Sequence, residues 1–192
     1  MTFPLSVQFN SVTGVVPGLE GSERRLSQLR GCFADERAFE EAARADPVVY
    51  AVTGVEIGNS PGDLHYGVGV LYPGRVGDEF YLTRGHVHAW REAAEVYVTT
   101  HGAGLMLLED ERSGRAWVEP MTAASVLVVP PFTLHRTVNV GDEPLVYVGV
   151  YPAAAGHDYA AVESRGFDQV ALADASAVTC GIQGVRVTRR NQ

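Results

Sequence analysis

The stretch "TRGHVHAWREAAEVYV", residues 83–98, contains three side chains that could ligate one metal ion. His86 and His88 are two positions apart, so in an extended strand both side chains project from the same face. Glu95 opens the next apolar segment, and a hairpin between the two segments would return it to the histidines. The alternative interpretation is a polar turn between two strands.

A fourth histidine, His135, follows the Pro-Pro pair of "VVPPFTLHRTVN" and opens another apolar segment. Three imidazoles and one carboxylate suit a divalent transition metal such as Fe, Mn, Ni, Co or Zn. Four protein ligands leave two open positions on a six-coordinate ion but none on a tetrahedral zinc, which favours an octahedral ion. His65 and His101 have no comparable neighbours and are interpreted as structural or exposed residues.

The elements that must position these residues are short apolar segments bounded by Gly, Pro, Asp or Asn, which are typical of strands. They read "VVYAVTGVEI", "LHYGVGVLYP", "DEFYLTRG", "AEVYVTTHG", "GLMLLED", "RAWVEPM", "SVLVVPP", "LHRTVNVG" and "PLVYVGVYP". "EDERSGRAW" indicates a hairpin whose turn is centred on Ser113 and Gly114. Strands without intervening helices predict an all-β protein, an antiparallel barrel or jelly roll.

The two ends of the chain differ from this pattern. Residues 22–45 predict two short helices broken near Gly31, with Asp35 as the N-cap of the second. "YAAVESRG" predicts a further short helix and "FDQVALAD" a final strand. We therefore expect one domain with an N-terminal arm and short helices over 1–45, a barrel over 46–175, and a C-terminal tail over 176–192, whose last residues, ending in "RRNQ", are loose.

Composition limits the classes of function. The 192 residues are 46% hydrophobic and carry a net charge of −8, which fits a soluble globular domain and argues against nucleic-acid binding. All 15 basic residues are arginine, so an anionic substrate must be held by Arg, hydroxyls or backbone N–H groups. Cys32 and Cys180 form no CxxC pattern, and we find no secretory segment or long apolar run. These features predict a cytoplasmic protein without a membrane segment.

Several motifs together resemble one family. "GHVHAWREAAEVY", "GAGLMLLED", "YPGRVGDEFYLTRG" and "VVPPFTLHRTVNVGDEPLVYVGVYPAAAGHDY" resemble the cupin-type glucose-6-phosphate isomerases of archaea and some bacteria, over roughly residues 45–170. The resemblance implies a cupin jelly-roll β-barrel, a homodimer and one divalent transition metal per subunit. It implies His86, His88, Glu95 and His135 as the metal ligands.

The same resemblance implies roles for further residues. Thr83 and Gly85 would hold the substrate phosphate, Tyr151 and Tyr159 would contact the substrate, and Tyr97 and His157 would lie near the sugar. The implied activity is the interconversion of glucose 6-phosphate and fructose 6-phosphate, a step of glycolysis and gluconeogenesis.

The implied chemistry has two forms. In one, the metal stabilises an enediolate and Glu95 is the base that carries the proton; in the other, hydride shifts directly and Glu95 only binds metal. His157 could serve ring opening, since an unperturbed imidazole pKa of about 6.5 suits a proton shuttle.

Two positions depart from the family pattern. Trp90 stands where many members have lysine, and Gly67 and Gly69 occupy a strand in which some members carry a phosphate-binding threonine. Two alternatives therefore stay open. One is another metal-dependent cupin enzyme of specialised metabolism (an epimerase, lyase or iron dioxygenase), and the other is a non-catalytic sugar-binding cupin.

Overall fold

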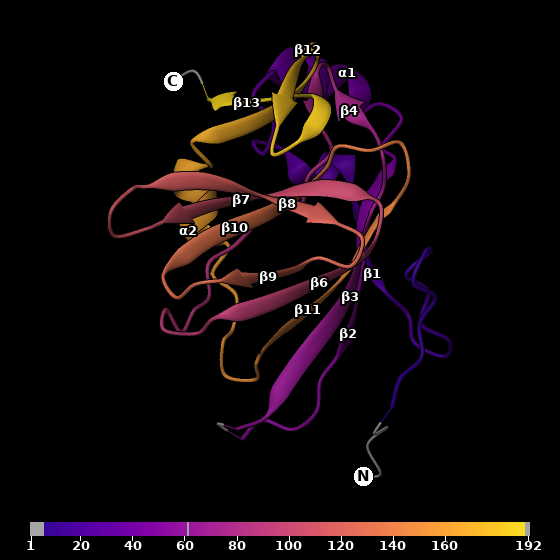
Figure 1. Ribbon diagram of the computed structural model, residues 1–192, viewed down its shortest axis with the longest axis vertical. Helices are drawn as coiled ribbons and strands as arrows, with labels where there is room; N and C mark the ends of the chain where they lie inside the picture. The colour runs from indigo at the N-terminus through magenta and orange to yellow at the C-terminus, as the bar shows by residue number, and fades with distance from the viewer. Residues whose placement is uncertain (1–5, 61, 191–192) are drawn as a thin grey trace.

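The computed structural model describes residues 6–60 and 62–190 (Figure 1). A six-stranded antiparallel sheet has the order β1-β2-β3-β11-β6-β9, formed by Ser22–Arg25, Val48–Val55, Leu64–Leu71, Leu145–Pro152, Glu95–His101 and Val126–Val129. A three-stranded sheet has the order β10-β7-β8, formed by Thr133–Asn139, Ala103–Asp110 and Ala116–Thr122. The edge strands β8 and β9 contact each other and β10 contacts β3 within the larger sheet, so the two sheets face each other in a jelly-roll barrel. The predicted all-β class is confirmed.

A third sheet covers one end of the barrel, at the top of Figure 1. Its order is β13-β12-β5-β4, formed by Ile182–Arg189, Gln169–Thr179, Glu79–Phe80 and Arg75–Val76. The helices are short: the 3-10 helix η1 spans Leu26–Leu29, α1 spans Glu36–Ala42 and α2 spans Ala160–Arg165. The helix predicted in "YAAVESRG" and the hairpin between β7 and β8 are both confirmed.

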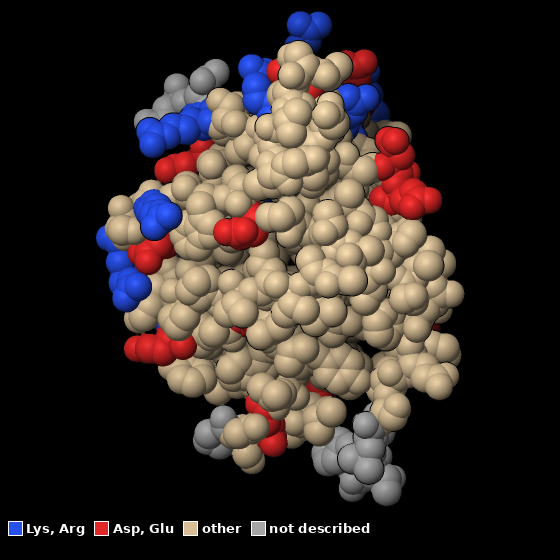
Figure 2. Space-filling model, viewed as in Figure 1, with Lys and Arg blue, Asp and Glu red and all other residues tan. Residues whose placement is uncertain are grey.

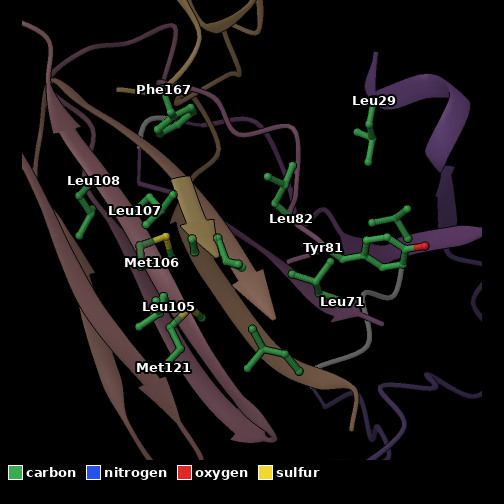
Figure 3. Close-up of a cluster of buried hydrophobic side chains, with 14 of the residues drawn as sticks. Leu29, Leu71, Tyr81, Leu82, Leu105, Met106, Leu107, Leu108, Met121 and Phe167 are labelled. Carbon is green, nitrogen blue, oxygen red and sulfur yellow. The ribbon is translucent and has the colours of Figure 1, made fainter. Parts of the chain in front are cut away.

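Alternation along the strands decides which side chains face the interior. In β6, Glu95, Tyr97 and Thr99 are buried while the intervening residues are partly exposed, as expected for a strand with one covered face. β7 instead is buried on both faces, and its central residues belong to the main hydrophobic core (Figure 3). Figure 3 shows Leu105, Met106, Leu107 and Leu108 of β7 with Met121, Phe167 and Leu82. The barrel interior is thus apolar around β7 and polar where β6 begins.

The N-terminal part differs from the prediction. Only one α-helix forms there, with Asp35 as its N-cap, accepting a hydrogen bond from the Ala38 N–H. The segment expected as the first helix is β1 followed by η1. β1 pairs with β2 in the register Ser22 to Val52, and this sheet pairing overrides a weak local helix preference. Consequently the expected boundary at residue 45 is not a structural break.

The expected C-terminal tail is a hairpin. β12 runs through position 175 to Thr179, and β13 returns along it from Ile182. The two residues between them, Cys180 and Gly181, have φ of 51° and 79°, the positive values that a two-residue hairpin turn requires. The prediction of a C-terminal tail over 176–192 is therefore wrong up to Arg189, while the last two positions of "RRNQ" lie outside the described residues.

The surface carries its charges unevenly. In the view of Figure 2, charged side chains gather at the end where Figure 1 places β12, β13 and α1, and along one edge, while the middle of this face is largely uncharged. Cys32 and Cys180 are both free thiols. Within residues 6–60 and 62–190, no helix combines the length and apolar character needed to cross a membrane.

Candidate metal centre and the adjoining cavity

Three imidazoles and one carboxylate converge inside the barrel. The ligand atoms of His86, His88, Glu95 and His135 all lie within 4.8 Å of one another. The Nε2 atoms of His88, His135 and His86 lie 3.2, 3.1 and 3.9 Å from Glu95 Oε2. The structure therefore brings together the four residues predicted to bind metal.

The strand pairing that assembles them differs from the predicted hairpin. His86 forms an antiparallel bridge with His135 of β10, with N···O distances of 3.1 and 2.9 Å. Glu95 opens β6 in the six-stranded sheet, paired with β9 and followed by residues that pair with β11. The prediction that segment 83–88 pairs with β6 is wrong, because residues 89–94 cross from one sheet to the other.

Hydrogen bonds to main-chain carbonyls orient two of the imidazoles. His88 Nδ1 lies 3.2 Å from the Ala93 oxygen, and His135 Nδ1 lies 3.1 Å from the Thr133 oxygen. A carbonyl only accepts, so each Nδ1 carries a proton and a neutral ring presents the Nε2 lone pair. Two lone pairs facing one carboxylate oxygen require a cation between them, either added protons or a metal ion.

His86 completes the test of whether a metal fits. Its Nε2 is buried and has no hydrogen-bond partner among the described residues, and burial lowers the pKa of His86 well below 6.5. Burial alone would raise the pKa of Glu95, but hydrogen bonds from His135 and His88, once their Nε2 atoms carry protons, lower it to about 2. A neutral imidazole with an unused nitrogen beside an ionised carboxylate is the donor set of a divalent transition metal.

A cavity of about 390 Å³ opens beside this cluster. Every predicted site residue except His88 lines it: Thr83, Gly85, His86, Glu95, Tyr97, His135, Tyr151, His157 and Tyr159. Burial, followed by the Glu95 carboxylate, raises the pKa of Tyr97 well above 10.0 and that of Tyr151 to about 12. Both tyrosines therefore keep their protons and act as hydroxyl donors rather than bases.

A chain of hydroxyl groups ends at Thr83. The main-chain N–H and the hydroxyl of Thr137 both donate to Thr83 Oγ1, at 3.1 and 3.2 Å. The Tyr147 hydroxyl lies 3.4 Å from the Thr137 hydroxyl, and burial raises the pKa of Tyr147, which keeps it protonated. Because Thr83 Oγ1 already accepts two hydrogen bonds, its role left to fill is that of a donor to a group bound in the cavity that it lines.

Gly85 is required by close approach as well as by its backbone. Its φ is 77°, and a Cβ there would lie 2.7 Å from Phe167 Cε2 and 2.9 Å from the His135 oxygen. Only glycine allows the chain to pass this close to β10 just before His86. The glycine that the resemblance assigns to substrate binding thus also fixes the position of a metal-ligand candidate.

The loop after β11 brings His157 to the cluster. Asp158 bridges to Val87, and the His157 ring centroid lies 4.4 Å from that of His86 and 5.4 Å from that of Tyr151. Burial lowers the pKa of His157, so the ring is neutral near neutral pH and can accept a proton.

One arginine ties this loop to the loop that follows His88. Arg91 donates to Asp158 at 2.7 Å, to Glu111 at 3.0 Å and to the main-chain oxygen of His88. We call this set of contacts the Arg91 clamp. It connects the positions of His88 and His157.

Sequence reasoning missed several residues of the cavity. Arg24 and Ser22 reach it from β1, Tyr50 from β2, and Tyr147 from β11. β1 was expected to be helical, so nothing in the sequence indicated that its arginine faces the site. The sequence contains no lysine, and Arg24 supplies a cationic side chain to the cavity.

The structure shows the surroundings of two residues that depart from the family pattern, Trp90 and Gly69. Trp90 is 45% exposed and does not line the cavity. At Gly69, a Cβ would lie 2.4 Å from the Tyr147 ring. The Tyr147 ring therefore takes the space that a threonine at position 69 would need.

Comparisons with known proteins agree with this description. A family model described as "Glucose-6-phosphate isomerase (GPI)" matches residues 23–183. A glucose-6-phosphate isomerase of Thermococcus onnurineus is 45% identical over 175 residues, covering 91% of this chain and 92% of that protein. One of Pyrococcus abyssi is 45% identical over 170 residues, covering 88% and 89%. Among solved structures, an oxalate oxidase has a TM-score of 0.49 at 16% identity, covering 59% and 56%, too weak a likeness to bear on activity.

An antiparallel jelly roll with a His and Glu cluster opening onto an internal cavity defines the class of cupin-type enzymes. Within that class the matched length and the identity to curated relatives are decisive. The chain belongs to the cupin-type glucose-6-phosphate isomerase family, and it is an isomerase.

Proposed function

We propose that this enzyme interconverts glucose 6-phosphate and fructose 6-phosphate and depends on a divalent metal held by His86, His88, Glu95 and His135. The observation that carries the proposal is the convergence of these four ligand atoms within 4.8 Å at the wall of a cavity. A cavity of about 390 Å³ suits a small metabolite. When bound, the ion supplies Lewis acidity for the oxygens on C1 and C2 of the open-chain sugar.

The phosphate end of the substrate is assigned to the part of the cavity around Thr83. Thr83 donates its hydroxyl proton there, and Arg24 adds a guanidinium. Charge-assisted hydrogen bonds to a phosphate are stronger than neutral ones, and they compensate for the absence of lysine. Gly85 contributes main chain at the same wall.

The sugar end is assigned to the part around His157. This neutral ring and the Tyr151 and Tyr159 hydroxyls line the cavity close to His86. His157 takes the proton of the anomeric hydroxyl and passes it to the ring oxygen as the bond from that oxygen to the anomeric carbon breaks, and both transfers reverse on closure. The Tyr97 hydroxyl donates a hydrogen bond to the Glu95 carboxylate and keeps it oriented.

Hydrogen transfer between C2 and C1 has two routes that use the same side chains. In the first, Glu95 removes a proton from C2 and returns it to C1; in the second, hydride moves directly and Glu95 serves only as a ligand. Turnover of fructose 6-phosphate in D2O separates them, because only a proton carrier exchanges with solvent. Deuterium at C2 of the product supports Glu95 as the base.

The activity is tested with purified protein whose metal content is measured by elemental analysis. We expect about one divalent ion per chain, fructose 6-phosphate isomerase activity, and loss of that activity in His88→Ala. His101→Ala is the matched control, since His101 pairs with Glu143 away from the cavity. Absence of turnover by fully metallated protein would overturn the proposal, and oxygen uptake with Fe(II) would indicate a different cupin chemistry.

Assembly and location complete the proposed function. We expect a homodimer in the cytoplasm, acting on a small sugar phosphate and not on nucleic acid or membrane. Light scattering after gel filtration gives the oligomeric state, and a monomer at micromolar concentration would contradict the first expectation.

A further inference from the structure

A second cavity, also of about 390 Å³, lies on the other side of the wall formed by Arg84 and Arg136. Five arginines line it: Arg30, Arg84, Arg136, Arg165 and Arg190. Glu163 is the one carboxylate among the described residues that line it. The cavity is therefore lined mainly by cationic side chains, although the whole protein has a net charge of −8. We call it the arginine cavity.

Three of these arginines already have carboxylate partners. Arg84 pairs with Glu163 at 3.0 Å. The other two pairs are Arg30 with Glu40 and Arg165 with Glu109. Their charges are therefore largely balanced, which leaves Arg136 and Arg190 to consider.

Arg190 is partly buried, and among the described residues it donates to two main-chain oxygens, at 3.1 Å to Gly31 and 2.6 Å to Phe33. These bonds fix the guanidinium at the cavity without neutralising it. A carbonyl dipole satisfies a donor but leaves the net charge in place.

Arg136 presents the stronger case. Strand alternation turns it away from His135, and its side chain lines the arginine cavity. It is 3% exposed, donates to the Arg84 oxygen at 2.6 Å, and stacks 4.2 Å over the Phe167 ring. Its Nε is buried without a hydrogen-bond partner among the described residues. A buried guanidinium with an unused donor is costly unless an anion meets it.

The buried acid Glu79 interacts electrostatically with Arg136 and Arg190 but forms no hydrogen bond to either. Glu79 Oε2 accepts the Ala34 N–H at 2.7 Å, and its Oε1 has no hydrogen-bond partner in the described chain. Burial also raises the pKa of Glu79. Arg136 and Arg190 therefore face a shared cavity, and neither forms an ion pair with a carboxylate among the described residues.

We propose that the arginine cavity binds a small multivalent oxyanion, the tetrahedral phosphoryl group of inorganic phosphate or of a phosphorylated metabolite. Planar guanidinium forks match the geometry of such oxygens, and Arg136 and Arg190 offer two of them. This site is separate from the cavity that holds the candidate metal ligands, although Arg84 and Arg136 line both. A bound anion would brace the wall from which His86 and His135 project.

Cys32 offers a reporter that senses only this cavity, because it lines the arginine cavity and not the other. In a Cys180→Ser background it is the one remaining cysteine. The experiment measures the rate at which a thiol reagent labels Cys32 in the full-length holoenzyme, with inorganic phosphate added against chloride at equal ionic strength. At phosphate ten times its Kd, mass action predicts labelling about tenfold slower.

Two variants make the test specific. Arg190→Gln should abolish the protection, whereas Arg186→Gln should keep it, because Arg186 lies on β13, just before Arg190, and pairs with Asp174 at the surface. No protection by phosphate, or equal protection in Arg190→Gln, would overturn the proposal. Comparing phosphate with fructose 6-phosphate shows whether the free ion or a phosphorylated metabolite is held more tightly.

Equilibrium dialysis gives a second measurement that does not depend on Cys32 reactivity. The Arg190→Gln variant should bind one phosphate fewer per chain than Arg186→Gln, while both keep equal isomerase activity at low phosphate. Equal phosphate binding by the two variants would contradict the arginine cavity as a site. If the wild-type protein shows no isomerase activity, the proposed function is contradicted, whereas the phosphate measurements still test the arginine cavity.

Discussion

Gly149 and Glu95 lie on neighbouring strands, β11 and β6, and a Cβ at position 149 would sit 2.7 Å from Glu95 Oε1. The carboxylate occupies space that only a glycine leaves open. Two features thus position Glu95. The histidines lie around Oε2, and Gly149 leaves room for Oε1. The candidate metal centre depends on a residue with no functional group.

Gly149→Ala should therefore displace Glu95 without unfolding the barrel. We expect metal affinity to fall by about 10- to 100-fold, the range for lost support of a ligand, and isomerase activity to fall with it. Metal content and kcat check this result. Gly54→Ala is the matched control, because a Cβ at this β2 glycine meets nothing within 4 Å. Unchanged metal content in Gly149→Ala would contradict the role assigned to this contact.

Removing the metal should lower thermal stability as well as activity. A chelator leaves three buried imidazoles around one carboxylate, whereas a bound ion at 1,000 times its Kd stabilises the fold by about 4 kcal/mol. Differential scanning calorimetry should show a lower Tm after chelation and recovery when a divalent ion is added back. His135→Ala should show no such shift. A wild-type Tm that is indifferent to chelator would count against a structural contribution from the ion.

Arg24 should act on the phosphate end of the substrate. Losing one charge-assisted hydrogen bond in Arg24→Gln should raise KM for fructose 6-phosphate about tenfold with little change in kcat. Arg37→Gln, an exposed arginine on α1, is the control. Steady-state kinetics with unphosphorylated fructose adds a second check, because the variant and the wild type should then be equal. A kcat effect of the same size on both sugars would assign Arg24 a different role.

Glu79 should make stability depend on pH. Burial raises its pKa above 4.5 in the folded protein, so the folded state holds this proton more tightly than the unfolded chain. The stability linked to Glu79 is present below pH 4.5 and is lost as pH rises through the folded pKa. Glu79→Gln removes that loss, and urea unfolding should show the variant gaining stability relative to wild type from pH 4 to pH 7. Glu119→Gln, on the exposed side of β8, should show no comparable trend.

The cluster of candidate metal ligands could be predicted from sequence because histidines two apart and a spaced carboxylate stand out within apolar strands. The route by which Glu95 reaches them was not. Its spacing from His88 fits a hairpin, whereas the chain crosses to the facing sheet, and local spacing does not distinguish the two. The four candidate residues come together although the expected connection was wrong, because both arrangements place Glu95 at the start of β6.

Arg24 and the arginine cavity were beyond sequence reasoning for a related reason. β1 forms by pairing with β2, and the cavity gathers arginines from positions between 30 and 190. Such proximity depends on long-range contacts that local propensity does not encode. The C-terminal hairpin was missed differently, since a turn with Cys180 at a positive φ lacks the usual Asn-Gly or Asp-Gly signal.

The Arg91 clamp sets a condition for redesigning this enzyme. Asp158 lies in the segment that carries His157, and its partner Arg91 also holds the main-chain oxygen of His88. A graft of residues 152–159 from a relative, made to accept another sugar, must bring an acidic residue at position 158. Without that acid, Arg91 would lose its partner in the grafted loop, and the exchange would also weaken the support of His88 in the opposite loop.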